Sequence, residues 1–517
     1  MRVIKPLVAA LGLSISFTAF ADTQVSIDTT KSGPIINKNI YGQFAEHLGR
    51  GIYEGIWVGP KSKIPNTKGW RNDVVGALKD LHVPLVRWPG GCFADEYHWR
   101  DGIGPRDKRP VKVNTNWGGV EEDNAVGTHE FFDLAEMLGA ETYVNGNLGT
   151  GTAQEMAEWL EYMTAEGKST LAELRRKNGR DKPFRVHYFA VGNEAWGCGG
   201  NMTPEYYTNL YKQYVAFLKT PENNRPKMIA SGGHTEDTSW AEHLTANVKP
   251  TYSSRMDAVS FHYYTLPTGD WKVKGAATGF PEKEWMSTMV NTLKMDQFII
   301  NNKKVMDKND PEKKVGFYVD EWGTWYDVEK GENPGFLYQQ NSLRDAIVAA
   351  LNFNIFHKHA DRVHMSNIAQ MVNVLQAMIL TDKDKMILTP TYHAYKMYVP
   401  FQDATSLPLE LKDVPEYKLG DVSVPAVSAT AARAKDGKIY LALVNANPNK
   451  AETVAINIAG VKASGVSGQV LTAAKMDAHN TFAAPEAITP TAYSAKASNG
   501  KLNLELPAKA VVVVAVE

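Results

Sequence analysis

The feature that most constrains the fold is an alternation of short apolar runs with helical segments between Ile40 and Leu380. Such alternation is typical of βα units built around a parallel sheet. In Thr128–Leu138, apolar residues recur at helical spacing and predict a helix with one core-facing stripe. We predict eight strands, at Ile40–Phe44, Leu85–Trp88, Thr142–Asn145, Tyr188–Gly192, Lys227–Ser231, Ala258–His262, Val315–Val319 and Arg362–Ser366. Eight strands with intervening helices predict an α/β fold, a (β/α)8 TIM barrel, instead of an open sheet.

Two of these strands end alike. Tyr188–Trp196 and Val315–Trp322 each carry an apolar run into a glutamate with a tryptophan close behind it. A lone glutamate at a strand end is usually a solvated or salt-bridged loop residue. Two matching endings favour a functional explanation, because a barrel gathers its chemistry at the carboxyl ends of its strands. Glu194 and Glu321 lie about three βα units apart, so they are predicted to face each other across one small substrate, as glycoside hydrolysis requires.

Polar residues at the other strand ends are predicted to complete a ring around this substrate. A neutral sugar needs many hydroxyl partners, and buried polar groups need hydrogen bonds. The candidates are Glu46, His47, Arg87, Asn145, Asn147, Asn193, His262, Tyr264, Asp320 and Gln370.

The overall composition agrees with a neutral substrate. The chain has 517 residues, 43% of them hydrophobic and 22% charged, and a formal net charge of −1. This length suits one large and one smaller domain. A near-neutral chain offers no electrostatic reason to bind nucleic acid or an anionic membrane.

Residues 1–21 have the pattern of a signal peptide. Arg2 and Lys5 precede a mostly apolar run from Leu7 to Phe20, and Ala19–Ala21 is a small-x-small cleavage site. The pattern predicts export to the periplasm or the extracellular medium. No cysteine stands at the cleavage point and no later segment is apolar enough to span a bilayer, so we expect no membrane anchor.

After Pro390 the helical periodicity disappears, and short strands such as Lys438–Val444 and Ala510–Val516 are separated by turn residues. This change predicts a C-terminal all-β sandwich, jelly-roll-like. The alternating segment Thr23–Asp28 is expected to add a strand to it. The predicted division is 1–21 signal peptide, 22–39 N-terminal strand, 40–388 catalytic barrel and 389–517 β-sandwich.

Five motifs resemble those of one known family, the α-L-arabinofuranosidases of glycoside hydrolase family 51. The resemblance spans the chain after residue 21, and the motifs together are far more specific than Gly-Asn-Glu alone. They are Tyr41–Gly49, Arg87–Gly91, Asp101–Pro105, Gly192–Glu194 and Asp320–Trp322.

The resemblance implies a retaining, exo-acting enzyme that releases arabinofuranose from arabinan, arabinoxylan or their oligosaccharides. It makes Glu194 the acid/base and Glu321 the nucleophile, and it implies a homo-oligomer, a hexamer. The chemistry fits: a retaining mechanism needs two close carboxyls, one protonated and one ionised. Further residues match positions that hold the sugar or the nucleophile or line the adjacent subsite, namely Glu46, Arg87, Trp117, Asn193, His262, Tyr264 and Gln370. Some family members carry Asn where this chain has Cys92, so this sugar contact departs from the family pattern.

Other hypotheses remain open. A β-glycosidase or endoglucanase could use the same barrel and carboxyl pair, and a carbohydrate-binding protein could lack activity. His357-Lys358-His359 could suggest a metal, but residues i and i+2 of a helix point apart, so we predict a solvated helix end, no metal site and no cofactor.

The two cysteines raise one more prediction. Cys92 and Cys198 both follow barrel strands and are expected in loops on the catalytic face. In an exported protein such a bond persists, so we predict that Cys92 and Cys198 form a disulfide. The alternative is two separate thiols, with Cys92 free to touch the sugar.

Overall fold

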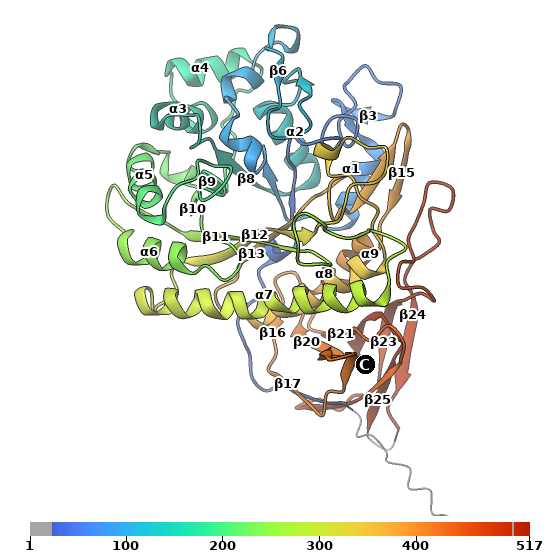
Figure 1. Cartoon of the computed structure of the whole chain (residues 1–517). Helices are drawn as coiled ribbons and strands as arrows, with labels where there is room; N and C mark the ends of the chain where they lie inside the picture. The colour runs from blue at the N-terminus through green and yellow to red at the C-terminus, as the bar shows by residue number, and fades with distance from the viewer. Residues whose placement is uncertain (1–22, 499–500) are drawn as a thin grey trace, which may run out of the picture.

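The computed structural model describes residues 23–498 and 501–517, so the predicted signal peptide lies outside the described residues. At its centre eight parallel strands close into a barrel, which confirms the predicted fold (Figure 1). In order around the barrel these strands are β2 (Gly42–Phe44), β5 (Leu85–Trp88), β8 (Glu141–Gly146), β9 (Tyr188–Val191), β10 (Lys227–Ala230), β11 (Ala258–Thr265), β12 (Gly316–Thr324) and β13 (Met365–Ile368).

Helices connect the strands and cover the outside of the barrel (Figure 1). The segment predicted to be helical from its apolar stripe is α2, and its buried residues include Phe131, Leu134 and Leu138. The helices are α1 (Asn72–Asp80), α2 (Thr128–Leu138), α3 (Ala153–Thr164), α4 (Thr170–Lys177), α5 (Pro204–Phe217), α6 (Ser239–Asn247), α7 (Glu282–Asn309), α8 (Leu343–Lys358) and α9 (Pro390–Tyr398).

The interior of the barrel is divided between an apolar and a polar part. Apolar and aromatic residues from several barrel strands form one buried cluster. Its members are Leu85, Tyr143, Tyr188, Ala190, Ile229, Ala258, Tyr318 and Met365. Of the two predicted catalytic residues, Glu194 follows its strand and Glu321 lies in the second half of β12.

The last barrel strand begins later than predicted. Arg362, the first residue of the predicted strand, precedes β13 and is completely buried. Its guanidinium forms ion pairs with Asp307 and Asp310 and donates to the carbonyl of Val315. A buried arginine needs several acceptors, and these lie on α7 and the segment after it, so the chain stays irregular there.

The C-terminal part forms two antiparallel-rich sheets that lie below the barrel in Figure 1. The six-stranded sheet has the order β16 (Thr405–Ser406), β20 (Val427–Arg433), β21 (Ile439–Asn445), β26 (Ala510–Val516), β23 (Gly465–Leu471) and β24 (Thr491–Lys496). The four-stranded sheet has the order β17 (Leu409–Lys412), β1 (Thr23–Asp28), β22 (Glu452–Ala459) and β25 (Leu502–Leu506). The boundaries at 39/40 and 388/389 remain a proposed division of the chain.

Four two-stranded hairpins complete the described strands. They are β3 (Asn66–Thr67) with β4 (Trp70–Arg71), β6 (Lys112–Val113) with β7 (Glu121–Glu122), β14 (Ile379–Asp382) with β15 (Lys385–Leu388), and β18 (Glu416–Leu419) with β19 (Val422–Pro425).

Helix α8 lies between the barrel and the sandwich, and this placement corrects one prediction. Lys358 is exposed, but His357 and His359 are both buried, so the expected solvated helix end is wrong. His357 bonds Tyr41 on the barrel side and Thr430 of β20. His359 instead bonds Asp296 of α7. The two rings point to different partners, as their i, i+2 spacing requires.

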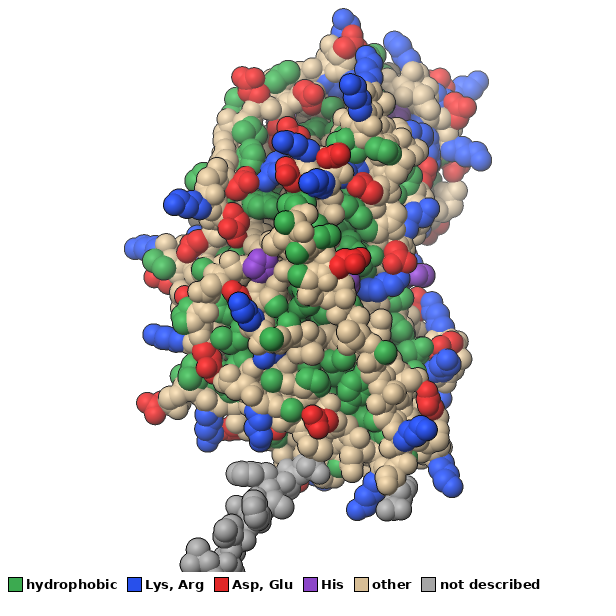
Figure 2. Space-filling view, turned by 90° about the vertical axis from the view of Figure 1, so that its right-hand side faces the viewer, with side chains coloured by type: hydrophobic (Ala, Val, Ile, Leu, Met, Phe, Trp, Pro, Cys, Tyr) green, Lys and Arg blue, Asp and Glu red, His purple; other side chains and the backbone are tan. Residues whose placement is uncertain are grey.

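The surface carries both signs of charge. Figure 2 shows basic and acidic side chains interspersed over the face in view, in agreement with the near-zero net charge. Within the described residues, none of the helices combines the length and the apolar character needed to cross a bilayer.

Candidate active site

The two predicted catalytic glutamates meet at the carboxyl end of the barrel. Glu194 follows β9, and Glu321 lies in β12 directly opposite His262 of β11. One oxygen of each carboxylate and a ring nitrogen of His262 lie within 4.8 Å of one another. All three side chains line a cavity of about 600 Å³. The barrel thus places a carboxyl pair and an imidazole in one pocket.

Glu194 sits in a tight turn after its strand. Its φ of 42° is in the left-handed region, which side chains other than glycine seldom adopt. The Glu194 carbonyl accepts hydrogen bonds from the N–H groups of Gly197 and Gly199, at 2.7 and 3.1 Å. The next N–H, that of Ala195, donates to Ser231 Oγ at 3.1 Å. These bonds turn the chain sharply enough to aim the carboxyl into the cavity.

Glu321 is held by two donors. Arg87 Nη1 donates to Oε2 at 2.9 Å, and the Tyr264 hydroxyl donates to Oε1 at 2.7 Å. Arg87 is itself buried, and its Nη2 donates to Asn193 Oδ1 at 2.6 Å. Its guanidinium also lies over the Phe44 ring, 4.2 Å from the centroid. Arg87 thereby links the nucleophile candidate to the residue that precedes Glu194.

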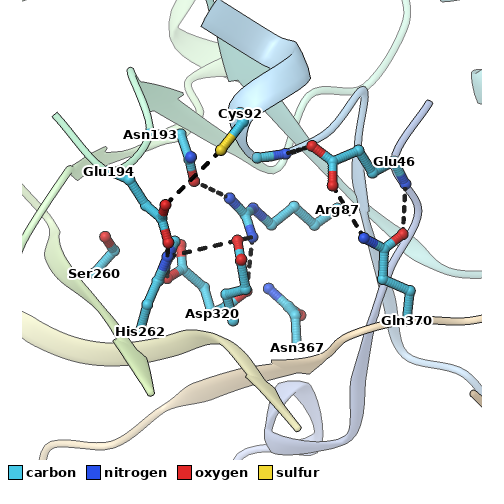
Figure 3. A network of polar contacts seen from close by, with 12 residues as sticks. Glu46, Arg87, Cys92, Asn193, Glu194, Ser260, His262, Asp320, Asn367 and Gln370 are labelled. Atoms are coloured by element: carbon cyan, nitrogen blue, oxygen red, sulfur yellow. Dashed lines mark hydrogen bonds and ion pairs between the residues drawn. The ribbon is translucent and has the colours of Figure 1, made fainter. Parts of the chain in front are cut away.

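His262 bridges the two carboxylates, and Figure 3 shows it beside Glu194. Its Nδ1 lies 2.9 Å from Glu194 Oε1 and 3.5 Å from Glu321 Oε2, and its Nε2 lies 3.1 Å from Asp320 Oδ1. Burial lowers the pKa of His262, but the charge of Glu321 and the hydrogen bonds to Asp320 and Glu194 outweigh it and raise the pKa to about 10. The imidazole is therefore a cation at neutral pH.

Asp320 belongs to this network, although no specific role was predicted for it. Its side chain is buried, and it accepts a hydrogen bond from the Tyr143 hydroxyl at 2.5 Å. Burial raises the pKa of Asp320, but His262 and Arg87 hold it below its usual value. Neighbouring strand residues usually point to opposite faces. The register of β12 shifts between Val319 and Trp322, and this irregularity lets Asp320 and Glu321 join one network.

The sequence placed Asp320 in the predicted polar ring, because it stands at a strand end beside Glu321. Tyr143 carries no such signal, because a tyrosine in a buried strand is equally compatible with simple core packing.

Glu46 and Gln370 form a second polar group on the opposite side of Arg87 (Figure 3). Gln370 donates from Nε2 to Glu46 Oε2 at 3.0 Å and accepts the Glu46 N–H at 3.1 Å. The N–H groups of Gly91 and Phe93 both donate to Glu46 Oε1. Burial and then the charge of Glu321 raise the pKa of Glu46 to about 7, despite those backbone hydrogen bonds. This pair lines the same cavity as Glu194 and Glu321.

The cavity extends well beyond the carboxyl pair. Trp117 lines it together with the apolar side chains of Leu48 and Leu337. Further aromatic residues contribute to its wall, among them Trp196, His234, Tyr263, Trp271 and Trp325. Aromatic rings with polar edges suit the apolar faces of sugars.

Cys92 and Cys198 form a disulfide, with their Cα atoms 5.5 Å apart. Both described cysteines are therefore bonded, so the alternative of a free Cys92 thiol has no support. The disulfide lies beside the acid/base candidate, with Cys198 Sγ 3.4 Å and Cys92 Sγ 3.9 Å from Glu194 Oε2. The predicted residues Glu46, Arg87, Cys92, Trp117, Asn193, Glu194, His262, Tyr264, Glu321 and Gln370 are thus gathered in and around one cavity.

A TIM barrel with two carboxyls this close at the strand ends defines a glycoside hydrolase. Two family models match the sequence: Alpha-L-arabinofuranosidase 1 domain over residues 77–273 and Alpha-L-arabinofuranosidase C-terminal domain over residues 320–510. The chain is 49% identical over 507 residues to an intracellular exo-α-L-arabinofuranosidase of Bacteroides ovatus, covering 98% of each chain.

Solved structures agree. The GH51 arabinofuranosidase from Xanthomonas axonopodis pv. citri superposes with a TM-score of 0.93 at 51% identity, covering 96% of this chain and 100% of that one. The thermostable GH51 α-L-arabinofuranosidase from Thermotoga petrophila RKU-1 gives 0.83 at 31% identity over the same shares. The chain belongs to the α-L-arabinofuranosidases of glycoside hydrolase family 51.

The comparison also corrects the predicted location. The Bacteroides ovatus relative, similar over nearly the whole chain, is named an intracellular enzyme. It contradicts export to the periplasm or medium, so that prediction is wrong, and a signal peptide at residues 1–21 has no support. A basic N-terminus followed by an apolar run shows only that the segment is hydrophobic. Hydrophobicity alone does not determine where a protein is located. Support for the cysteine pair now rests on its geometry and no longer on export.

Proposed function

We propose that this chain is a retaining exo-α-L-arabinofuranosidase that uses Glu321 as nucleophile and Glu194 as acid/base. The observation that carries the proposal is the separation of the two carboxylates, which have oxygens within 4.8 Å of each other. Retaining glycosidases keep their carboxyls about 5–5.5 Å apart, whereas inverting enzymes leave about 6.5–9.5 Å for a water molecule. The short separation therefore supports direct attack by a carboxylate.

In the first step Glu321 attacks the anomeric carbon while Glu194 protonates the departing oxygen. Arg87 and Tyr264 direct the carboxylate of Glu321 by donating to both of its oxygens. The proposed products of this step are a covalent arabinosyl–Glu321 ester and a free alcohol. Donors fixed before the reaction need no reorganisation as charge moves from the nucleophile.

In the second step Glu194, now ionised, takes a proton from water, and the water oxygen displaces Glu321 from the anomeric carbon. Two displacements at one carbon return the original configuration. The His262 ring lies beside both glutamates, with Nδ1 2.9 Å from Glu194 Oε1 and 3.5 Å from Glu321 Oε2. It also holds Glu194 in place between the steps through its Nδ1–H.

The sugar hydroxyls are proposed to bind Glu46, Asn193 and Gln370, whose polar ends lie around the carboxyl pair. Cys92 contributes through its disulfide sulfur, which is part of the cavity wall. Trp117 is proposed to line the neighbouring subsite. A cavity of about 600 Å³ lies within the range that buries drug-sized ligands, which leaves room for a leaving-group sugar beside the arabinose.

The proposed substrates are arabinan, arabinoxylan and their oligosaccharides, cleaved at terminal arabinofuranose. The exo mode is supported by the name of the Bacteroides ovatus relative. A homo-oligomer, a hexamer, remains a proposal as well.

A substrate panel tests the function. We expect turnover of nitrophenyl α-L-arabinofuranoside, with little on nitrophenyl β-D-xyloside and none on carboxymethylcellulose. Proton NMR at early times should detect α-arabinofuranose first, before mutarotation. A β first product would refute retention, and a preference for the xyloside or the cellulose would instead favour a β-glycosidase or endoglucanase. No turnover of any glycoside would favour a carbohydrate-binding protein.

A further inference from the structure

The short 3₁₀ turn η2 (Cys92–Asp95) contacts both ends of the loop that carries Glu194. At the start of the turn Cys92 is bonded to Cys198, and at its end Asp95 accepts the N–H of Asn193. We propose that η2 is a two-point clamp, in which Asp95 and the disulfide are positioning residues that hold the Glu194 carboxyl where it can transfer a proton. The clamp rests on the proposed role of Glu194 as acid/base.

The loop needs such a clamp because its backbone is strained. Glu194 has a φ of 42° and Asn201 a φ of 53°, both in the left-handed region. A residue held in a sparsely populated conformation persists only when its surroundings determine it. Released from its contacts, the peptide before Glu194 would relax, and the carboxyl would move with it.

Asp95 supplies the first point of the clamp. It is buried, its Oδ2 accepts the Asn193 N–H at 3.0 Å, and its Oδ1 accepts the N–H groups of Leu148 and Gly149 at 2.8 and 2.9 Å. The carboxylate thus joins the ends of β8 and β9. A Cβ on Gly199 would lie 2.9 Å from Asp95 Oδ2 and 1.9 Å from the Asn193 carbonyl oxygen, so the loop folds tightly over this carboxylate.

Asp95 acts at a distance from the substrate. It is absent from the residues that line the catalytic cavity, whereas Glu194 and Cys92 are among them. Its three acceptor contacts all go to backbone groups. Its effect on catalysis must therefore pass through the position of Glu194.

The disulfide supplies the second point. A bonded sulfur has no proton to donate, so the contacts of 3.4 and 3.9 Å to Glu194 Oε2 are packing contacts that limit where the carboxyl can move. The other oxygen, Oε1, is held by His262 at 2.9 Å. Figure 3 shows the Cys92 sulfur directly beside Glu194. Cys198 is exposed, so a small reductant can reach the bond.

Loosening the clamp should affect proton transfer more than nucleophilic attack. A general acid contributes about 10²–10⁴-fold to rate, and a misplacement of about 1 Å can cost about 10²-fold. Departure of a strongly acidic phenol needs little protonation, whereas departure of an ordinary phenol needs the full contribution. The ratio of kcat/KM for a dinitrophenyl over a phenyl α-L-arabinofuranoside therefore reports the position of Glu194.

The first experiment measures this ratio for Asp95→Asn. Asn keeps the size of Asp but replaces one oxygen by an NH₂ group, which must face either Asn193 N–H or the Leu148 and Gly149 pair. We expect the ratio to rise by about tenfold or more, with the phenyl substrate losing most of its rate. Glu130→Gln is the matched control, because Glu130 is also a buried carboxylate but pairs with Arg109 elsewhere. Its ratio should stay at the wild-type value.

The second experiment needs no mutation. A water-soluble phosphine breaks the Cys92–Cys198 bond in the folded wild-type protein: phosphorus supplies two electrons and takes the oxygen of a water molecule, and the two protons of that water go to the thiols. Mass spectrometry after alkylation follows the two thiols formed. The ratio should rise in step with reduction and return on reoxidation.

Glu194→Ala calibrates both experiments. If its ratio does not exceed that of the wild type, the role of Glu194 is wrong and the proposed function fails at that point. If Glu194→Ala raises the ratio while folded Asp95→Asn or the reduced protein stays within about twofold of the wild type, the two-point clamp is wrong. Circular dichroism establishes that the proteins compared are folded. Should Asp95→Asn not fold, the reduced wild type decides by the same criterion.

Discussion

Asp320→Asn should bring the titration of His262 into the neutral pH range. In the wild type, Asp320 Oδ1 lies 3.1 Å from His262 Nε2, and its other oxygen accepts the Tyr143 hydroxyl. In the variant, the asparagine oxygen can keep the Tyr143 bond, which turns its NH₂ group toward Nε2. That nitrogen must then be an acceptor, and only the neutral imidazole offers one.

The size of the shift follows from the geometry. Two unit charges about 4 Å apart interact by about 4 kcal/mol at an effective dielectric of about 20, and one pKa unit corresponds to about 1.4 kcal/mol. Removing the charge of Asp320 should lower the pKa of His262 by about three units. The starting value is about 10, so the variant imidazole should lose its proton near pH 7.

The direction of the change in the His262 pKa can be determined from a pH–rate profile. Wild-type His262 stays cationic through the neutral range, whereas the variant imidazole becomes neutral as pH rises through about 7. Above that pH the variant lacks the positive charge between Glu194 and Glu321, so kcat/KM for the nitrophenyl substrate should fall along a new alkaline limb. The profile should be measured from pH 4.5 to 9.5, with imidazole resonances followed by NMR.

Tyr143→Phe is the control. It removes the hydroxyl that donates to Asp320 but leaves the carboxylate charge next to His262. Its alkaline limb should stay near that of the wild type. The reasoning is refuted if folded Asp320→Asn keeps the wild-type alkaline limb, or if Tyr143→Phe shifts it as far as Asp320→Asn does.

Three further predictions concern the catalytic pair, stability and assembly. Glu321→Ala should lose several orders of magnitude of activity on every substrate, whereas Glu194→Ala should still form the arabinosyl–Glu321 intermediate from substrates with activated leaving groups. Azide should rescue Glu194→Ala with an α-arabinosyl azide product, because it replaces water in the second displacement. Rescue of Glu194→Ala to the β azide, or of Glu321→Ala to the α azide, would reverse the roles. Because the pKa of Glu46 rises to about 7 on folding, the folded state binds more protons and stability should fall as pH rises from about 4.5 to 7, by at most about 3 kcal/mol. Denaturant unfolding of Glu46→Gln should show a flatter dependence over this range; the same slope in variant and wild type would contradict it. Light scattering at micromolar concentration should give an oligomer, and a monomeric mass would exclude the proposed hexamer.

The sequence alone predicted the barrel and the catalytic pair. The alternation of apolar runs with helical segments sets the fold class, because period and run length reflect which faces of each element are buried. The endings around Glu194 and Glu321 could be recognised because parallel strands deliver their last residues to one edge. These are local properties, so they can be recognised in the sequence alone.

Tertiary structure decided what depends on a neighbour remote in sequence. Asp320 joins the hydrogen-bond network of His262 through a shift in strand register, and Asp95 accepts hydrogen bonds from backbone groups that follow β8 and β9. His357 and His359 are buried because the sandwich and α7 pack over their helix, which their polar local sequence does not reveal. The distance between two side chains that are far apart in the sequence is determined only when all eight strands close into the barrel. Closure of the barrel decides which backbone groups remain unpaired and which charged groups are buried together.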